Sequence, residues 1–162
     1  MNMSETHPAA SWHPAHILAT WFGTGLSPIA PGTAGSLAAL PFAYVISYYL
    51  GIIGLGIAIS IIVAVGFWAA HLFSKRTKSE DAGPVVIDEV SGQWLTLLLV
   101  PADILFYAIG FVLFRIADIV KPWPISWVDR RIKGGLGVML DDILAGGLAA
   151  IILWNIWLLT KI

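Results

Sequence analysis

The chain alternates long apolar blocks with short polar segments. No charged residue occurs between Ala34 and Phe73, a run of forty positions, whereas one membrane-spanning helix needs about 20. This block therefore predicts two spans, roughly 35–50 and 52–73, with a tight turn near Leu50-Gly51. Three more apolar segments follow, at about 85–100, 104–120 and 138–159. Two of these five segments are short for a full crossing.

The composition indicates that lipid covers much of the surface. Hydrophobic residues make up 58% of the 162 positions and charged residues 12%, against about 45–50% and about 25% in soluble domains. A soluble chain of this size could not bury so much apolar surface. We therefore expect a single domain, residues 1–162, that is an all-α, polytopic integral membrane helical bundle with four to five membrane segments. The net charge of −1 gives no support to a nucleic-acid partner, and the absence of cysteine excludes disulfides and thiolate chemistry.

Residues 1–33 form a polar approach that contains proline and glycine. Residues 1–22 lack the pattern of a signal peptide and predict a cytoplasmic, interfacial segment, with a short helix from Trp12 to Phe22. Residues 23–162 would form the catalytic bundle. The stretch GTGLSPIAPGTAGS, residues 23–36, predicts a structured loop. Its hydroxyls and N–H groups suit an anion, although a helix-capping turn with Ser36 as N-cap explains it equally well. The hydroxyl residues concerned are Ser27, Thr33 and Ser36.

Basic residues occur in two of the connecting segments. Residues 74–84 carry three, and residues 121–137 carry four. Basic residues in short loops mark the cytoplasmic side, so the N-terminus and both segments are predicted to be cytoplasmic and the C-terminus outside. In this topology five acids reach one shallow cytoplasmic layer from separate segments: Asp88, Glu89, Asp118, Asp141 and Asp142.

Clustered carboxylates repel one another, so such a layer needs protons or a cation. An oxygen-only set without cysteine or clustered histidine suits Mg²⁺, with Mn²⁺ as a substitute, better than zinc. Each acid also has a purely structural explanation. Asp88, Glu89, Asp141 and Asp142 could complement helix dipoles, and Asp118 could pair with Arg115.

A stripe of alternating charge runs along the fourth apolar segment. Arg115, Asp118 and Lys121 follow at intervals of three, which places them on one helical face. Arg115 and Lys121 could bind a phosphate while Asp118 reaches a metal, an arrangement that stabilises the charge of a phosphoryl-transfer transition state.

Four stretches resemble phosphatidylglycerophosphatase A, a bacterial membrane enzyme family. They are GTGLSPIAPGTAGSLAALP, IDEVSGQW, FRIADIVKPWPI and GGLGVMLDDILAG, residues 23–41, 87–94, 114–125 and 134–146. The resemblance implies an Mg²⁺-dependent protein of the bacterial inner membrane whose acidic motifs face the cytoplasm. Its substrate would be phosphatidylglycerophosphate in the membrane, and its products phosphatidylglycerol and phosphate.

The sequence favours metal-assisted hydrolysis of a phosphomonoester. No cysteine is present, D-x-D is absent, and no histidine lies in the acidic motifs, which leaves water or a carboxylate as the attacking group. We expect Asp88, Asp118 and Asp142 to be direct metal ligands, with Glu89 as a further candidate, and Glu89 or Asp141 to activate water. The alternative is a cation or proton transporter that uses the same acids, although transporters usually carry their charges near the midplane.

Overall fold

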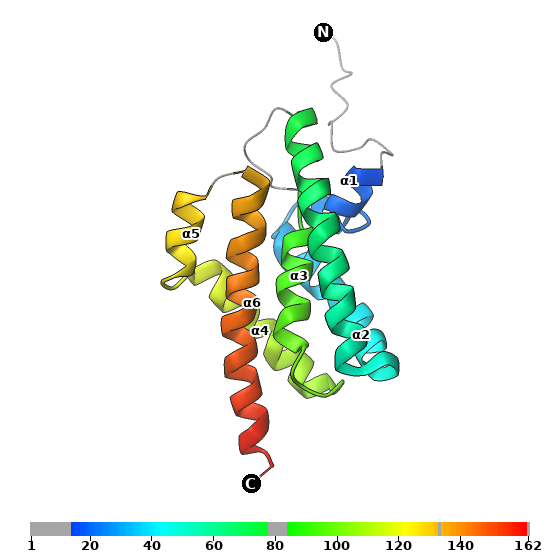
Figure 1. The fold of residues 1–162 in the computed structure, drawn as a ribbon, viewed down its shortest axis with the longest axis vertical. Helices are drawn as coiled ribbons and strands as arrows, with labels where there is room; N and C mark the ends of the chain where they lie inside the picture. Colours follow the sequence, from blue (N-terminus) through cyan, green and yellow to red (C-terminus); the bar gives the residue numbers. More distant parts are fainter. Residues whose placement is uncertain (1–13, 78–83, 133, 162) are drawn as a thin grey trace.

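The computed structural model describes residues 14–77, 84–132 and 134–161, and in this part of the chain helices are joined by short turns, without strands. The helix α1 and the beginning of α6 lie toward one end of the bundle, and the C-terminal end of α6 lies at the other (Figure 1). The predicted all-α class is confirmed. The elements are α1 (Pro14–Ala19), the 3₁₀ turn η2 (Thr24–Leu26), α2 (Pro31–Thr77), α3 (Ile87–Leu97), α4 (Ile104–Val120), α5 (Ile125–Arg131) and α6 (Gly134–Leu159).

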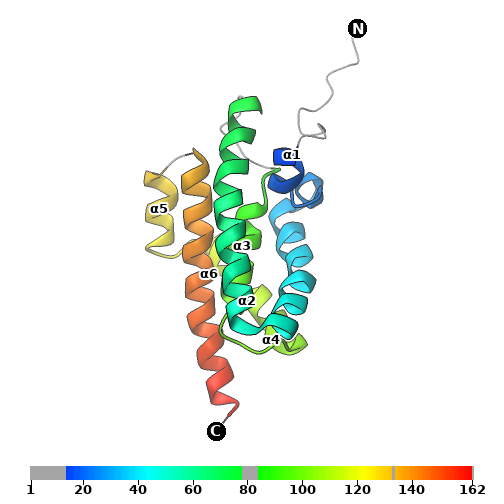
Figure 2. The ribbon, with the colours of Figure 1, turned by 45° about the vertical axis from the view of Figure 1, so that its right-hand side comes forward.

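The long element α2 is a hairpin of two helical arms. Its backbone leaves the helical region at Gly51, where φ is 64° and ψ is −164°, a conformation that suits a residue without Cβ. Figure 2 shows the chain reversing direction there, so that the two arms run side by side. The predicted turn near Leu50-Gly51 is therefore confirmed. The second arm extends to Thr77, so the polar segment predicted to begin at residue 74 starts inside this helix.

Two helical regions are long and apolar enough to cross a membrane by length and composition: Pro31–Ala69 and Gly134–Leu159. The first contains the turn at Gly51, and its arm from Pro31 to Leu50 is about 30 Å long at 1.5 Å per residue. That length matches the hydrocarbon thickness of a bilayer. The 11-residue helix α3 is about 16 Å long and therefore too short to cross.

The predicted loop from Gly23 to Ser36 is only partly a loop. The helix α2 begins at Pro31, and Ser36 lies inside it, where its hydroxyl donates to the carbonyl of Gly32 at 2.8 Å. The expectation that Ser36 caps the helix is therefore wrong. Proline is favoured in the first helical turn, and the glycines that argued against a helix are needed for packing. A Cβ on Gly35 would lie 2.8 Å from the side chain of Val86.

The segment between α4 and the last span also contains helix that the sequence analysis missed. Residues Ile125–Arg131 form α5, and α6 begins at Gly134 rather than near residue 138. The acids Asp141 and Asp142 therefore lie about two turns inside α6 instead of in its first turn. Gly137 packs so closely against the carbonyl of Ile132 that a Cβ would collide with it. This contact explains why position 137 is a glycine.

The short connection between α3 and α4, residues 98–103, ends in a helix cap. The carboxylate of Asp103 accepts hydrogen bonds from the backbone N–H groups of Leu105 at 2.8 Å and Phe106 at 3.3 Å. The sequence analysis had treated this region only as a break, whereas Asp103 fixes the start of α4. The end of α4 at Val120 agrees with the predicted boundary.

The short helix α3 is the centre around which the longer helices pack. Nine of its eleven residues are buried. The indole N–H of Trp94 donates to the carbonyl of Ala39 in α2 at 2.9 Å, and the backbone N–H of Val86, just before α3, donates to Ala19 at 2.8 Å. The Val86 bond holds the start of α3 against α1, and the Trp94 bond holds its second half against α2. Together they fix the position of the acidic first turn.

Candidate active site

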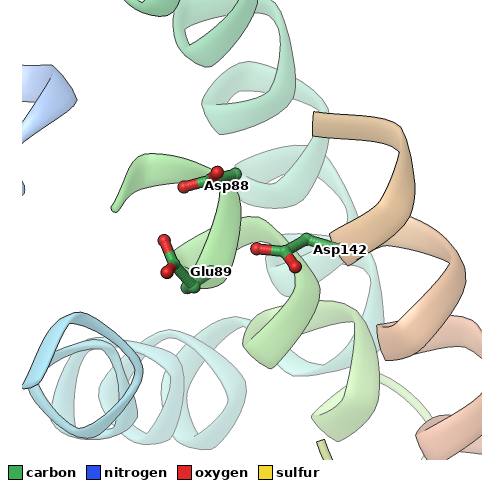
Figure 3. Close-up of side chains that lie close together, drawn as sticks. All are labelled: Asp88, Glu89 and Asp142. Atoms are coloured by element: carbon green, nitrogen blue, oxygen red, sulfur yellow. The ribbon is translucent and has the colours of Figure 1, made fainter. Parts of the chain in front are cut away.

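Three carboxylates from two helices meet in the interior of the bundle. Asp88 and Glu89 project from α3, and Asp142 projects toward them from α6 (Figure 3). One oxygen of each lies within 4.8 Å of the others. Asp88 and Asp142 are buried and Glu89 is partly buried. Asp142 is more than fifty positions from Asp88 and Glu89 in the chain, so only tertiary packing brings it to them.

The approach of α3 to α6 depends on two glycines. A Cβ on Gly146 would collide with the carbonyl of Gly92, and a Cβ on Gly92 would lie 2.6 Å from the carbonyl of Asp142. The hydroxyl of Thr96 supports the same crossing by donating to the carbonyls of Gly92 at 2.9 Å and Gly146 at 3.3 Å. Residues with side chains at these positions would separate the helices. The crossing therefore sets the distance between Asp142 and the acids of α3.

The local electrostatics disfavour the charged forms of the acids on α3. Burial, followed by the negative charges of Glu89 and Asp142, raises the pKa of Asp88. Burial also raises the pKa of Glu89, and Arg115 offsets this only in part. One oxygen each of Asp88 and Glu89, Oδ1 and Oε2, is buried without a hydrogen-bond partner. Because their position at the start of α3 favours negative charge only modestly, the acids need another source of positive charge.

An oxygen-only set of this kind fits a hard divalent cation. Mg²⁺ and Mn²⁺ prefer carboxylate oxygens, and the unpartnered oxygens of Asp88 and Glu89 offer free coordination capacity. Asp88, Glu89 and Asp142 are the residues that could hold such an ion together. Asp118 lies at the edge of this cluster, close enough to act electrostatically on Glu89 and Asp142.

Arg115 brings a positive charge beside the cluster. Its Nη1 is 2.7 Å from Oδ2 of Asp118 and donates to the hydroxyl of Ser36 at 3.4 Å. Gly32 makes room for this arrangement, because a Cβ there would collide with Oε1 of Glu89 and lie 3.1 Å from Nη1 of Arg115. The buried Nε of Arg115 has no hydrogen-bond partner. This N–H remains available to an anionic ligand.

Lys121 lies in a second ionic group, next to the first. Its Nζ is 2.6 Å from a carboxylate oxygen of Asp129 in α5 and 2.6 Å from one of Asp141 in α6. Burial would lower the pKa of Lys121, but the hydrogen bonds to both acids outweigh this and raise it. The sequence analysis predicted that Lys121 binds the substrate phosphate, and it did not consider Asp129 as a partner. The structure shows Lys121 joining α5 to α6 and holding Asp141.

The three predicted hydroxyl residues have different surroundings. Ser36 is buried beside Arg115, as described above. The hydroxyl of Ser27 instead donates to the carbonyl of Ile29 at 2.9 Å, a contact within its own exposed turn. Thr33 is partly exposed in the first turn of α2. Of these three residues, the described contacts link only Ser36 to the charged groups.

Gln93 is a buried polar residue that the sequence analysis missed. It lies one helical turn after Glu89 on α3 and is fully buried, yet neither its amide nitrogen nor its amide oxygen has a hydrogen-bond partner. Position alone could have suggested it, since residues four apart share a helical face. Gln93 lies between Gly92 and Trp94 in a largely apolar block, so its position on the same face as Glu89 was not noticed.

Comparison with known proteins identifies relatives along most of the chain. The family model described as phosphatidylglycerophosphatase A matches residues 17–157. A phosphatidylglycerophosphatase A of Escherichia coli is 47% identical over 150 residues, which cover 89% of this chain and 84% of that protein. One of Haemophilus influenzae is 33% identical over 163 residues, covering 97% of this chain and 100% of that protein.

A further relative has a different name. A protein of Bacteroides thetaiotaomicron with the provisional name phosphatidylinositol-3-phosphatase is 40% identical over 137 residues, which cover 80% of this chain and 85% of that protein. No solved structure matches the chain significantly. All three relatives named here are therefore described as phosphatases of phosphorylated glycerophospholipids.

Proposed function

The chain belongs to the phosphatidylglycerophosphatase A family, and from this membership we propose that it hydrolyses the terminal phosphate of phosphatidylglycerophosphate. Water adds to phosphorus, the bond from phosphorus to the glycerol oxygen breaks, and phosphatidylglycerol and inorganic phosphate leave. The observation that carries the proposal is the meeting of Asp88, Glu89 and Asp142 within 4.8 Å beside Arg115. This is a site for a phosphate group together with a divalent cation.

We propose that Asp88, Glu89 and Asp142 hold Mg²⁺, for which Mn²⁺ can substitute. When bound, the ion supplies positive charge to the phosphoryl oxygens and lowers the pKa of water. The two unpartnered oxygens on α3 support this assignment. Asp118 completes the acidic set that the sequence predicted, in a position held by Arg115 at 2.7 Å.

The residues of the chain would share the remaining work of the reaction. Arg115 can donate its free Nε–H to a phosphate oxygen, while Asp118 and Ser36 fix the orientation of its guanidinium group. Charge-assisted bonds of this kind are strong and directional. Glu89 is the proposed proton acceptor from water, because it lies in the carboxylate cluster and its Oε2 has no hydrogen-bond partner. Lys121 pairs with Asp141 and keeps α5 docked on α6.

The proposed setting is the inner membrane of a bacterium, with the site facing the cytoplasm. We propose that both arms of α2, α4 and α6 cross the bilayer and that α3 enters it from one side. The basic residues of α5 would then lie at the cytoplasmic surface. The chain has no cysteine, so a single Arg130→Cys substitution gives a unique label. A reagent that cannot cross the membrane should label this residue only in inverted vesicles; labelling in intact cells would contradict the orientation.

Phosphate release by the purified protein tests the activity. We expect release from phosphatidylglycerophosphate that requires Mg²⁺ and is lost in Asp88→Asn and Asp142→Asn, with Asp103→Asn as a control acid outside the cluster. Phosphatidylinositol 3-phosphate should be assayed in parallel, since one relative bears that name. Bound Mn²⁺, measured by electron paramagnetic resonance, should fall in the two site variants alone. Full activity of Asp142→Asn would contradict the site.

The transporter alternative gains no support from the relatives, which are named as phosphatases. The acids also gather near the beginning of α3 and in the first half of α6 rather than midway along the long helices. Cation flux into liposomes that contain the protein, in the absence of lipid phosphate, would favour the transporter.

A further inference from the structure

An apolar groove lies on the outside of the bundle between the first arm of α2 and α4. Its volume is about 480 Å³, within the range of about 300–1,000 Å³ that is usual for ligand sites. One wall comes from α2 (Leu40, Pro41, Tyr44 and Val45) and the other from α4 (Ile104, Tyr107 and Ala108).

The floor of the groove is held by specific contacts. The hydroxyl of Tyr107 donates to the carbonyl of Ala43 at 3.3 Å, and the rings of Tyr107 and Tyr44 meet edge to face with centroids 5.5 Å apart. Tyr107 is only 4% exposed, whereas Val45 and Ile104 at the rim are 54% and 78% exposed. The groove is therefore a preformed depression that opens sideways.

The groove lies on the same pair of helices as the candidate active site, a short distance along them. Two hydrogen bonds between α2 and α4 give the spacing: Arg115 to Ser36 at the site, and Tyr107 to Ala43 in the groove. They are separated by seven residues on α2 and eight on α4, or about 10–12 Å along either helix. Ser36 and Leu40 are one turn apart on one helical face. The groove thus begins about one turn beyond the guanidinium group of Arg115.

We propose that this groove holds one acyl chain of the lipid substrate while the phosphate lies at Arg115 and the carboxylate cluster. The proposal rests on the proposed function and adds a binding site for the tail. A lipid can enter from the side without leaving the bilayer, because the rim is apolar and lies on helices that are flanked by exposed apolar residues such as Leu37 and Val112.

The groove would act on the rate more than on the affinity. A tail in the bilayer is already in an apolar solvent, so moving it into the groove gains no hydrophobic energy, only packing. The gain is geometric, because a tail held between α2 and α4 fixes how deeply the headgroup reaches into the site. Displacement of a reacting group by about 1 Å can cost about 100-fold in rate. Tail placement is therefore expected to appear in kcat/KM for long-chain substrate.

A substitution that fills the groove tests the proposal. Ala108→Phe adds an aromatic ring to one wall at an exposed position, where it displaces no core residue. The matched control is Ala64→Phe, another exposed alanine, on the second arm of α2 and outside the groove. Each protein is assayed with dioleoyl phosphatidylglycerophosphate in mixed micelles and with the water-soluble deacylated headgroup. Val45→Phe, which fills the groove from the other wall, serves as a second variant.

We expect Ala108→Phe and Val45→Phe to lower kcat/KM for the dioleoyl substrate about tenfold or more, with kcat/KM for the deacylated substrate unchanged. Ala64→Phe should change neither value. If the ratio of kcat/KM for the dioleoyl substrate to kcat/KM for the deacylated substrate were the same in all four proteins, the proposal that the groove binds an acyl chain would be wrong. The proposal would also be wrong if the wild-type protein were a dimer, Ala108→Phe made it a monomer, and the ratio of the two kcat/KM values stayed the same. The groove would then be filled by a second copy of the chain.

A labelling experiment provides a measurement that does not depend on turnover. Phosphatidylglycerol with a diazirine in one acyl chain, diluted into dioleoyl phosphatidylcholine, should label residues 40–45 and 104–108 more than other exposed apolar positions. Uniform labelling would contradict the proposal. If the wild-type protein released no phosphate from either substrate, the proposed function would fail, and the labelling would still decide whether the groove binds a tail.

Discussion

Neutralising Asp142 should make the metal-free protein more stable, although it should abolish activity. Two unit negative charges 4.8 Å apart repel by about 3.5 kcal/mol at an effective dielectric constant of about 20, and one oxygen of each of the three carboxylates lies within that distance of the others. Asp142→Asn removes two of the three repulsions. The cluster can take up a proton instead of bearing all three charges, so the realised gain is smaller, about 1–2 kcal/mol.

The sign of this effect should reverse when a divalent cation is added. A gain of 1–2 kcal/mol corresponds to a rise of about 2–8 °C in Tm for a chain of this size. At an Mg²⁺ concentration of about 100 times Kd, the wild-type protein should gain about 2.7 kcal/mol, or about 5–11 °C. Asp142→Asn should gain little, because it has lost a ligand. The variant would thus be more stable than the wild type in EDTA and less stable in Mg²⁺.

Intrinsic fluorescence is a suitable assay, since the chain has eight tryptophans. Melting in detergent is followed in EDTA and across an Mg²⁺ series. Asp103→Asn is the matched control, because asparagine caps a helix as well as aspartate does; its Tm should stay near that of the wild type in both conditions. A lower Tm for Asp142→Asn than for wild type in EDTA would refute the idea that the carboxylates repel one another.

Three further predictions concern the parts that surround the cluster. Gly146→Val should lower the free energy of unfolding by about 1–3 kcal/mol or more and abolish activity, because the Cβ of the new valine would collide with Gly92. The control is Gly147→Ala, at a neighbouring position with open space around it, which should change neither the stability nor the activity. Arg115→Lys should lower kcat/KM about 10–100-fold, since one charged hydrogen bond contributes about 1.5–3 kcal/mol. The control Arg130→Lys, at an exposed position, should leave kcat/KM unchanged. Similar kcat/KM values for the two variants would contradict the proposal that Arg115 binds the phosphate. Finally, in EDTA the Tm should fall as pH rises from about 4, the ordinary range of carboxyl groups, through the raised pKa values of Asp88 and Glu89. The folded protein holds more protons than the unfolded chain across that window, so rising pH favours unfolding, and a Tm that is constant or rises would contradict the assignment.

The sequence alone was sufficient for features that depend on local patterns. Forty positions without charge predicted two helical arms, and a glycine between them predicted the turn that the structure places at Gly51. The helix from Ile104 to Val120 was predicted with its observed ends. The spacing of Arg115 and Asp118 predicted a shared face, which the structure shows as an ion pair. Hydrophobicity and helical periodicity act over a few residues, so they can be recognised without the fold.

Features that depend on contacts between distant segments could not be predicted in this way. Asp129 became part of the site only because α5 folds against α6 and brings it to Lys121. Gly32 and Gly35 indicated a loop by their intrinsic preference, yet they lie in α2, where a side chain would collide with Glu89 and with Val86 respectively. The packing of α2 against these distant residues outweighs a local preference of about 1 kcal/mol.

The acidic residues show both kinds of information in one site. Their identities and their approximate level along the helices followed from the sequence, through the topology that the basic residues imply. Which acids meet was decided by the crossing at Gly92 and Gly146, which brings Asp142 to Asp88 and Glu89. Asp141, its neighbour in the chain, instead faces Lys121. Adjacent residues on a helix point about 100° apart, so only the packing of α6 against α3 determines which of the two enters the cluster.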